Sequence, residues 1–233
     1  MSVADQHHLT IPSGSLALRA TVVLPEQPSG AGVLFVHGLG SDRRTNVERA
    51  HAVAEQHGIT GLAVDLGGHG DSTGALSQMT PRQNLADVVA AFDALASRPG
   101  VEAARLGVCA ASYGAYLSVL LSRERAVARL LLRAPALYCD DRLDSPLSTR
   151  GRGDPECSKA FLGVLSQVAT PILVVESEHD EVIPPRVIQT YLSARPGTRR
   201  EVLPGAAHAL TDPAWRAVFQ QMVLDFFADL ASR

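Results

Sequence analysis

Short apolar runs alternate with longer segments of helical period along most of the chain. Residues 7–12 and 16–24 alternate apolar and polar positions on either side of Ser13-Gly14, which predicts an antiparallel hairpin. The later runs are almost continuously apolar, as in strands that are buried on both faces. They span residues 32–36, 60–65, 105–109, 128–132 and 171–176, and a shorter run follows at 200–203.

Segments of helical period lie between these runs. They span residues 43–57, 81–97, 113–123, about 157–167, 185–194 and 213–231. The second segment opens with a capping box, because Thr80 is followed by Pro81 at the first helical position and by Gln83 at the third. Strand–helix alternation predicts an α/β fold, with a mostly parallel central sheet, crossover helices on both faces and an N-terminal antiparallel hairpin.

The chain reads as one domain, residues 1–233, because neither a repeat nor a break in composition divides it. One stretch departs from the alternation. From Tyr138 to about Glu156 the sequence is polar and rich in glycine and proline, and it is longer than an ordinary connection. We therefore expect a small insertion over about 138–167 that resembles a lid or cap.

The composition and charge of the chain argue against several classes of protein. Apolar residues make up 46% of the chain and charged residues 19%, which excludes a disordered protein. The net charge of −3 argues against a nucleic-acid partner, and no run reaches the roughly 18 apolar residues that a membrane helix needs. The first eight residues lack the features of a signal peptide, so we expect a cytoplasmic protein. The oligomeric state stays open.

The cysteines and histidines predict neither a metal site nor a cofactor. The three cysteines, Cys109, Cys139 and Cys157, form no Cys-x-x-Cys pair, and reduced thiols are expected in a cytoplasmic chain. A disulfide between Cys139 and Cys157, which flank the expected lid, is the less favoured alternative. No histidine pair has a metal-binding spacing such as His-Glu-x-x-His.

The clearest chemical signal lies at the end of the apolar run 105–109. Ser112 follows it, with Ala110 two residues before and Gly114 two residues after, and helical sequence then resumes. This is the pattern of a nucleophile elbow, a turn too tight for bulky neighbours. It places the backbone N–H of Tyr113 at a helix N-terminus, where negative charge is stabilised. The ordinary alternative is a serine that caps a helix.

A serine nucleophile needs a histidine base and a carboxylate to orient that base. Asp180 follows the apolar run 171–176, and His208 follows the run 200–203, in the chain order serine, acid, histidine. All three residues therefore leave the carboxyl ends of strands, where α/β sheets bind ligands. Glu178 or Glu181 could replace Asp180, and His179 is a weaker rival base.

A third feature is a strand that ends in His37-Gly38-Leu39-Gly40. Such a loop supplies the second backbone N–H of an oxyanion hole, here from Leu39, and its glycines allow close approach to a substrate. His37 and Gly38 are therefore candidate substrate-binding residues. Arg150 and Arg152, in the polar stretch, are candidate contacts for an anionic group, although solvated loop charges are the commoner explanation.

Taken together, these motifs resemble those of α/β-hydrolase-fold serine hydrolases, in the small, nearly lidless branch of esterases and dienelactone-hydrolase-like proteins with a serine nucleophile. The resemblance covers about residues 7–230 and includes an Asp-x-x-Gly-x-Gly-x-Ser turn at residues 65–72. It implies the following roles: Ser112 as nucleophile, Asp180 as acid, His208 as base, and the amides of Leu39 and Tyr113 as oxyanion donors. Ala110 and Ala115 depart from the family, in which glycine is commoner.

The expected activity is hydrolysis of a small-molecule carboxylic ester, preferably with a short chain, through an acyl-enzyme on Ser112. An acyl-peptidase or amidase, a thioesterase and an acyltransferase would use the same residues. A catalytically silent protein that keeps the fold to bind a ligand is the alternative of another class.

Overall fold

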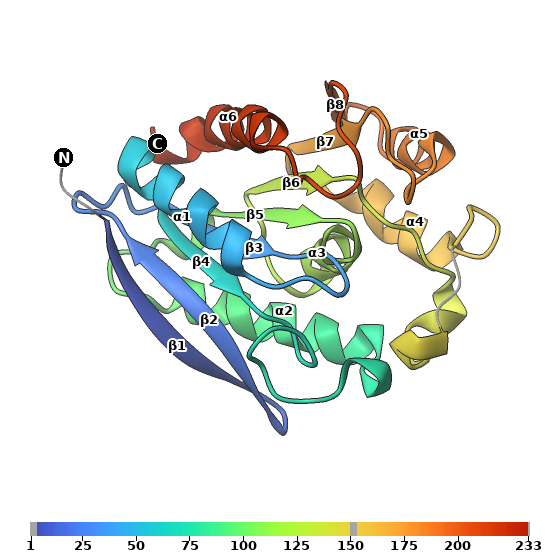
Figure 1. The fold of residues 1–233 in the computed structure, drawn as a ribbon, viewed down its shortest axis with the longest axis horizontal. Helices are drawn as coiled ribbons and strands as arrows, with labels where there is room; N and C mark the ends of the chain where they lie inside the picture. Colours follow the sequence, from blue (N-terminus) through green and yellow to red (C-terminus); the bar gives the residue numbers. More distant parts are fainter. Residues whose placement is uncertain (1–3, 150–152, 233) are drawn as a thin grey trace.

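An eight-stranded sheet runs through the centre of the molecule in the computed structural model, which describes residues 4–149 and 153–232 (Figure 1). The strands are β1 (Asp5–Ser13), β2 (Leu16–Leu24), β3 (Gly32–Val36), β4 (Thr60–Val64), β5 (Leu106–Ala111), β6 (Arg129–Arg133), β7 (Ile172–Ser177) and β8 (Arg199–Leu203). Their order across the sheet is β1-β2-β4-β3-β5-β6-β7-β8. β2 is antiparallel to β1 and to β4, and the remaining neighbours are parallel.

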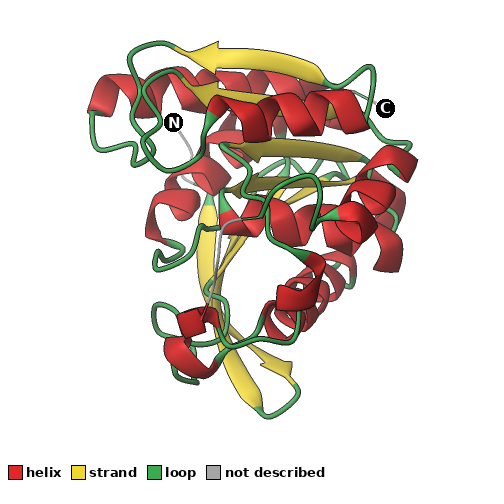
Figure 2. Ribbon diagram, turned by 90° about the vertical axis from the view of Figure 1, so that its right-hand side faces the viewer, coloured by secondary structure: helices red, strands yellow, loops and turns green. Residues whose placement is uncertain are grey.

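Helices cover both faces of the sheet (Figures 1 and 2). One layer holds α1 (Arg44–His57) and α6 (Pro213–Ala231), and the other holds α2 (Pro81–Ala96), α3 (Tyr113–Glu124), α4 (Lys159–Gln167) and α5 (Pro185–Ala194). Successive side chains of β3 point to opposite faces, as strand geometry requires. Leu34 therefore belongs to the core under α2 to α5, and Phe35 to the core under α1 and α6.

The predicted fold is confirmed. Every expected strand and helix is present, with ends that differ by a few residues, and β3 and β4 are buried along their whole length. The capping box of α2 is formed as well. Gln83 N donates to Thr80 Oγ1 at 3.2 Å, and Thr80 N donates to Gln83 Oε1 at 2.9 Å.

The segment after β6 turns back over the start of α2 before it enters α4. Its backbone joins α2 through a hydrogen bond from Arg82 N to Leu143 O, and Leu147 N donates to Met79 O. The last part of the expected insertion forms α4, whose Phe161 is buried in the core against α3 and α5. Residues 159–167 thus belong to the helical layer. Closure of the preceding loop as a lid stays a prediction.

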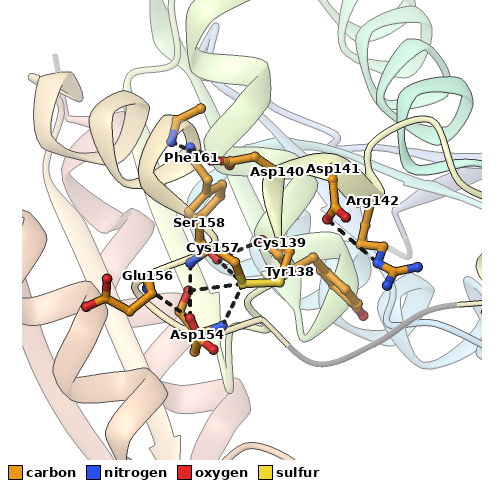
Figure 3. The surroundings of a disulfide bond; sticks show 11 residues. Tyr138, Cys139, Asp140, Asp141, Arg142, Asp154, Glu156, Cys157, Ser158 and Phe161 are labelled. Carbon is orange, nitrogen blue, oxygen red and sulfur yellow. Dashed lines mark hydrogen bonds and ion pairs between the residues drawn. A yellow bond between two sulfur atoms is a disulfide. The ribbon is translucent and has the colours of Figure 1, made fainter.

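The prediction of reduced thiols is wrong for Cys139 and Cys157, which form a disulfide across a sequence separation of 18 residues (Figure 3). Folding brings them together because Asp140 accepts hydrogen bonds from the backbone N–H groups of Ala160 and Phe161 at the start of α4. Asp140 N also donates to Cys157 O at 2.8 Å. Cys109 remains a free, buried thiol, and burial raises its pKa to about 12.

Replacing both Cys139 and Cys157 by serine should lower the free energy of unfolding by about 3 kcal/mol, because the cross-link removes loop-closure entropy from the unfolded chain. Urea unfolding of the two proteins measures the difference. A reductant should destabilise the wild type and leave the double variant unchanged. Equal stability of the oxidised wild type and the double variant would contradict this expectation.

Within the described ranges, no helix is long and apolar enough to cross a membrane. The same residues contain no group of three or more histidine, cysteine, aspartate or glutamate side chains arranged to hold a metal ion. A cytoplasmic location stays a prediction.

Candidate active site

Ser112 stands at the sharp turn between β5 and α3, as the elbow pattern predicts. Its backbone has φ 51° and ψ −115°, in a region that side-chain-bearing residues rarely adopt. The turn is held by neighbouring backbone, since Ser112 N donates to Arg133 O at 2.9 Å and Ala136 N donates to Ser112 O at 3.1 Å. Ser112 lines two pockets of the surface.

The loop after β3 packs directly against this elbow. A Cβ added at Gly114 would lie 2.4 Å from the carbonyl oxygen of His37, so only glycine fits there. A Cβ added at Gly38 would lie 3.3 Å from Ser112 Cβ. The two glycines therefore let the His37–Gly40 loop approach the serine closely, as the sequence motifs lead one to expect.

His208 and Asp180 meet beside this elbow. His208 Nδ1 lies 2.8 Å from Asp180 Oδ2 and 3.0 Å from Oδ1, and the Asp180 side chain is 5% exposed. With Nδ1–H donating to the carboxylate, Nε2 is the ring nitrogen left for other chemistry. Ser112 and His208 line the same two pockets, and no hydrogen bond joins the two side chains among the described residues. Such contacts are often long before a substrate is bound.

Asp180 is held as a carboxylate. Burial alone would raise its pKa, but hydrogen bonds from His208 and from the backbone N–H groups of Ile183 and Val182 outweigh that effect. The pKa of Asp180 therefore lies below its usual range. Asp180 is charged at neutral pH and can stabilise a protonated imidazole.

The rival residues occupy other positions. Glu178 accepts the backbone N–H of Gly205 at 2.7 Å, and Glu181 accepts the backbone N–H of His208 at 3.2 Å. Neither carboxylate contacts the imidazole, and His179 is exposed. The two glutamates instead tie the loop after β7, which carries Asp180, to the histidine loop, which is the loop after β8 that carries His208. These bonds help to fix the place of His208.

Two backbone N–H groups are available near Ser112. In the part of the chain that the structure describes, the N–H groups of Leu39 and Tyr113 donate to no other protein group. Tyr113 is the first residue of α3, where N–H groups point along the helix axis and favour a negative charge. Leu39 lines both pockets together with Ser112.

The His37 ring is hydrogen-bonded to the backbone through both of its nitrogens and holds the His37–Gly40 loop in place. Leu66 N donates to His37 Nε2 at 3.1 Å, so the ring proton is on Nδ1, which donates to Gly38 O at 2.7 Å. Burial lowers the pKa of His37 to about 4, so the ring is neutral near pH 7. Both ring nitrogens are used by the backbone. Contact of His37 or Gly38 with a substrate stays a prediction.

The buried His37 should make the protein sensitive to acid. Its folded pKa of about 4 lies below the unfolded value of 6.5, so the unfolded chain takes up the proton first as the pH falls. This contribution to stability is complete above pH 6.5, and about 3 kcal/mol is lost on the way to pH 4. Urea unfolding across this range should show a shallower decline for His37→Gln than for the wild type.

A matched control for this experiment is His7→Gln. His7 is half exposed, with its side chain against Asp5 on the edge strand β1. That variant should keep the decline of the wild type. The explanation fails if His37→Gln loses as much stability between pH 6.5 and pH 4 as the wild type does.

Two pockets meet at Ser112, Leu39 and His208. One has a volume of about 430 Å³ and is bordered mainly by apolar side chains of the segment after β6 and of the stretch that leads into α5, among them Leu137, Ile183 and Val187. The charged Arg186 also borders it. The other has a volume of about 320 Å³ and lies toward α1 and α6. A substrate whose scissile bond lies at Ser112 would thus have one pocket for the group on each side of that bond.

Two buried arginines of the second pocket are not among the residues predicted from the sequence. Arg49, on α1, and Arg133, at the end of β6, are each 8% exposed and line that pocket. Arg133 Nη1 donates to His208 O at 2.9 Å, which helps to hold the histidine loop. A charged residue at the end of an apolar strand was the available signal. Arg150 and Arg152, the predicted contacts for an anion, lie outside the described residues.

Comparisons with known proteins identify the family of this chain. The family model for serine aminopeptidase, S33, matches residues 27–152. An α/β-hydrolase domain-containing protein of Caenorhabditis elegans, aho-3, is 30% identical over 70% of this chain and 47% of its own length. An uncharacterized protein of Mycobacterium tuberculosis is 30% identical over 77% of this chain and 63% of its own length. The chain therefore spans about half to two thirds of the length of these relatives.

Among solved structures, Est1E from Butyrivibrio proteoclasticus, with ferulic acid bound, has the same fold. It superposes with a TM-score of 0.80 and 17% identity, over 97% of this chain and 100% of its own. That likeness concerns the fold, whereas the family model covers more than half of this chain, including the turn at residues 65–72 and the elbow at Ser112. The chain is a member of the serine aminopeptidase S33 family of α/β-hydrolases.

Proposed function

We propose that this hydrolase cleaves a carboxylic ester of a small molecule through a covalent acyl-enzyme on Ser112. The observation that carries the proposal is the hydrogen bond from His208 Nδ1 to the buried Asp180, in a loop that borders the same pockets as Ser112. An imidazole oriented in this way presents Nε2 as a base, which a serine hydroxyl requires in order to attack a carbonyl.

In the proposed reaction, His208 Nε2 takes the proton of Ser112 as Oγ attacks the carbonyl carbon. Asp180 stabilises the imidazolium, while the N–H groups of Leu39 and Tyr113 donate to the tetrahedral oxyanion. The imidazolium then returns the proton to the leaving alcohol. A water molecule, activated by the same histidine, attacks the acyl-enzyme and releases the acid.

The apolar pocket of about 430 Å³ supports a short-chain carboxylesterase. Its volume lies at the lower end of the range for small-molecule sites. Amide, peptide and thioester bonds pass through the same tetrahedral intermediate, so the choice among them depends on the substrate contacts and not on Ser112, Asp180 or His208.

Two measurements test the proposal. A fluorophosphonate probe should form an adduct on Ser112, located by mass spectrometry, and heat-unfolded protein should form none. A panel of aryl esters of increasing chain length, compared with aminoacyl anilides, should show turnover of the short esters. The absence of an adduct on folded protein would instead favour a ligand-binding protein without catalysis, and turnover of anilides alone would replace the esterase with a peptidase.

A further inference from the structure

The pocket of about 320 Å³ beside Ser112 is lined by three arginines, Arg49, Arg133 and Arg216, and we refer to it as the arginine pocket. Arg49 comes from α1, Arg133 from the end of β6 and Arg216 from the first turns of α6. Because Ser112 and His208 border the same space, a group bound there lies next to the site of attack.

Two of these guanidinium groups are buried, and only neutral groups accept their hydrogen bonds. Arg49 Nη1 donates to Thr45 O and to Asn46 Oδ1, both at 2.9 Å, and Arg49 Nε is buried without a partner among the described residues. Arg133 Nη1 donates to His208 O at 2.9 Å and to Ser177 Oγ at 3.4 Å. A buried charge is normally paired with an opposite charge.

No such pair is present. Across residues 4–149 and 153–232, no carboxylate lies within 4.0 Å of the guanidinium groups of Arg49, Arg133 or Arg216. At longer range, the charge of Asp180 acts on Arg133 and that of Glu48 acts on Arg49, and the Asp180 carboxylate is already bonded to His208. Burial and the neighbouring Arg49 lower the pKa of Arg133 to about 10, which leaves it charged at neutral pH.

The ring of Phe219 contacts both buried guanidinium groups. The guanidinium carbon of Arg49 lies 5.0 Å from the ring centroid, and that of Arg133 lies 5.9 Å from it. Cation–π contacts of this kind offset some of the cost of burying a charge. They do not neutralise it, and the polar side chains of Ser41, Thr45 and Asn46 also border the space. The pocket is therefore built for a negative group.

Resting on the proposed hydrolysis, we propose that the arginine pocket binds a carboxylate of the substrate, so that the preferred esters carry a negative charge a few bonds from the scissile carbonyl. The uncharged part of the substrate then lies in the apolar pocket on the other side of Ser112. A guanidinium–carboxylate contact is a charge-assisted hydrogen bond, which is stronger than a neutral one.

Matched esters test this in the wild-type protein. In the first pair, ethyl hydrogen glutarate carries the carboxylate on the acyl side and is compared with the neutral ethyl pentanoate. In the second pair, 4-acetoxybutanoate carries it on the alcohol side and is compared with the neutral butyl acetate. In at least one pair, kcat/KM for the anionic ester should exceed that for the neutral ester about tenfold or more. Ratios that stay below about tenfold in both pairs, with the neutral esters cleaved, would overturn this inference and leave the proposed hydrolysis standing.

Variants locate the effect. Arg49→Gln and Arg216→Gln should each lower the ratio of anionic to neutral kcat/KM by about fivefold or more. Arg216 is only partly buried, so its variant keeps the test valid if Arg49→Gln fails to fold. The matched control is Arg44→Gln, on the same helix, where Arg44 is exposed and paired with Asp42. An unchanged ratio in both pocket variants, or an equal loss in the control, would overturn the assignment.

Binding separates this inference from the proposed hydrolysis. Calorimetry with Ser112→Ala and ethyl hydrogen glutarate should show binding that Arg49→Gln, introduced in the same background, weakens about tenfold. If neither class of ester is cleaved but this binding is present and depends on Arg49, the arginine pocket stands and the hydrolysis fails. If Ser112→Ala binds ethyl pentanoate as tightly as the glutarate ester, the inference is wrong.

Discussion

Replacing Ser112 by alanine is expected to lower kcat/KM on an aryl ester such as 4-nitrophenyl butyrate by roughly four to six orders of magnitude. The substitution removes the attacking oxygen and leaves the Asp180–His208 hydrogen bond in place. Any remaining hydrolysis would come from the oxyanion N–H groups and from substrate binding alone. Initial rates measured on purified protein, after mass spectrometry has excluded a contaminating hydrolase, provide the test.

The control for this variant is Ser122→Ala. Ser122 lies on the same helix, α3, where its hydroxyl donates to the carbonyl of Val119. That variant should retain activity within about threefold. If Ser112→Ala keeps more than about a hundredth of the wild-type rate, the acyl-enzyme mechanism is wrong.

A second variant at the same position separates chemistry from folding. Ser112 has φ 51°, a conformation that costs a residue with a Cβ roughly 1–3 kcal/mol. Ser112→Gly relieves this strain, whereas Ser112→Ala retains it. Both variants should be inactive, and the glycine variant should be at least as stable as the alanine variant in urea unfolding. That difference would show that the backbone conformation at position 112 costs stability.

The sequence predicts the fold well because the sheet is buried. Strands such as β3 and β4 are apolar along their whole length, and helices such as α2 begin at a recognisable cap, so both kinds of element are marked locally. The three residues of the proposed triad are also marked locally, because each lies in the turn or loop that follows a strand of the sheet. Local sequence marks where a strand ends, and the parallel topology brings those ends together.

Pairings between distant residues are harder to predict. The inner face of α1 carries Ala50, Val53 and Ala54, as an apolar pattern predicts, but the structure also buries Asn46 and Arg49 there. An arginine on the inner face of a helix is recognisable only when its surroundings are known. The Cys139–Cys157 bond poses the same problem, since it depends on how the segment after β6 returns to α4 and not on the spacing of the two cysteines.

Replacing Asp180 by asparagine is expected to lower kcat by about 10⁴-fold, with a small effect on KM. Asparagine keeps the size of the side chain, but its amide can donate to Nδ1 and thereby favour the wrong tautomer of His208. It also removes the negative charge that the N–H groups of Val182 and Ile183 hold beneath the imidazole. Steady-state kinetics on the same aryl ester separate the two parameters.

The neighbouring glutamates provide matched controls, because each carries the same charge on the same loop. Glu178→Gln removes the acceptor of Gly205 N, and Glu181→Gln removes the acceptor of His208 N. Both should retain kcat within about tenfold, because neither carboxylate contacts the imidazole ring. A loss in Glu181→Gln as large as that in Asp180→Asn would assign the acid to Glu181 and require the histidine loop to turn away from the place it has here. The hydrogen bonds from Val182 and Ile183 argue for Asp180, because they lower the pKa of the carboxylate that is bonded to His208 Nδ1.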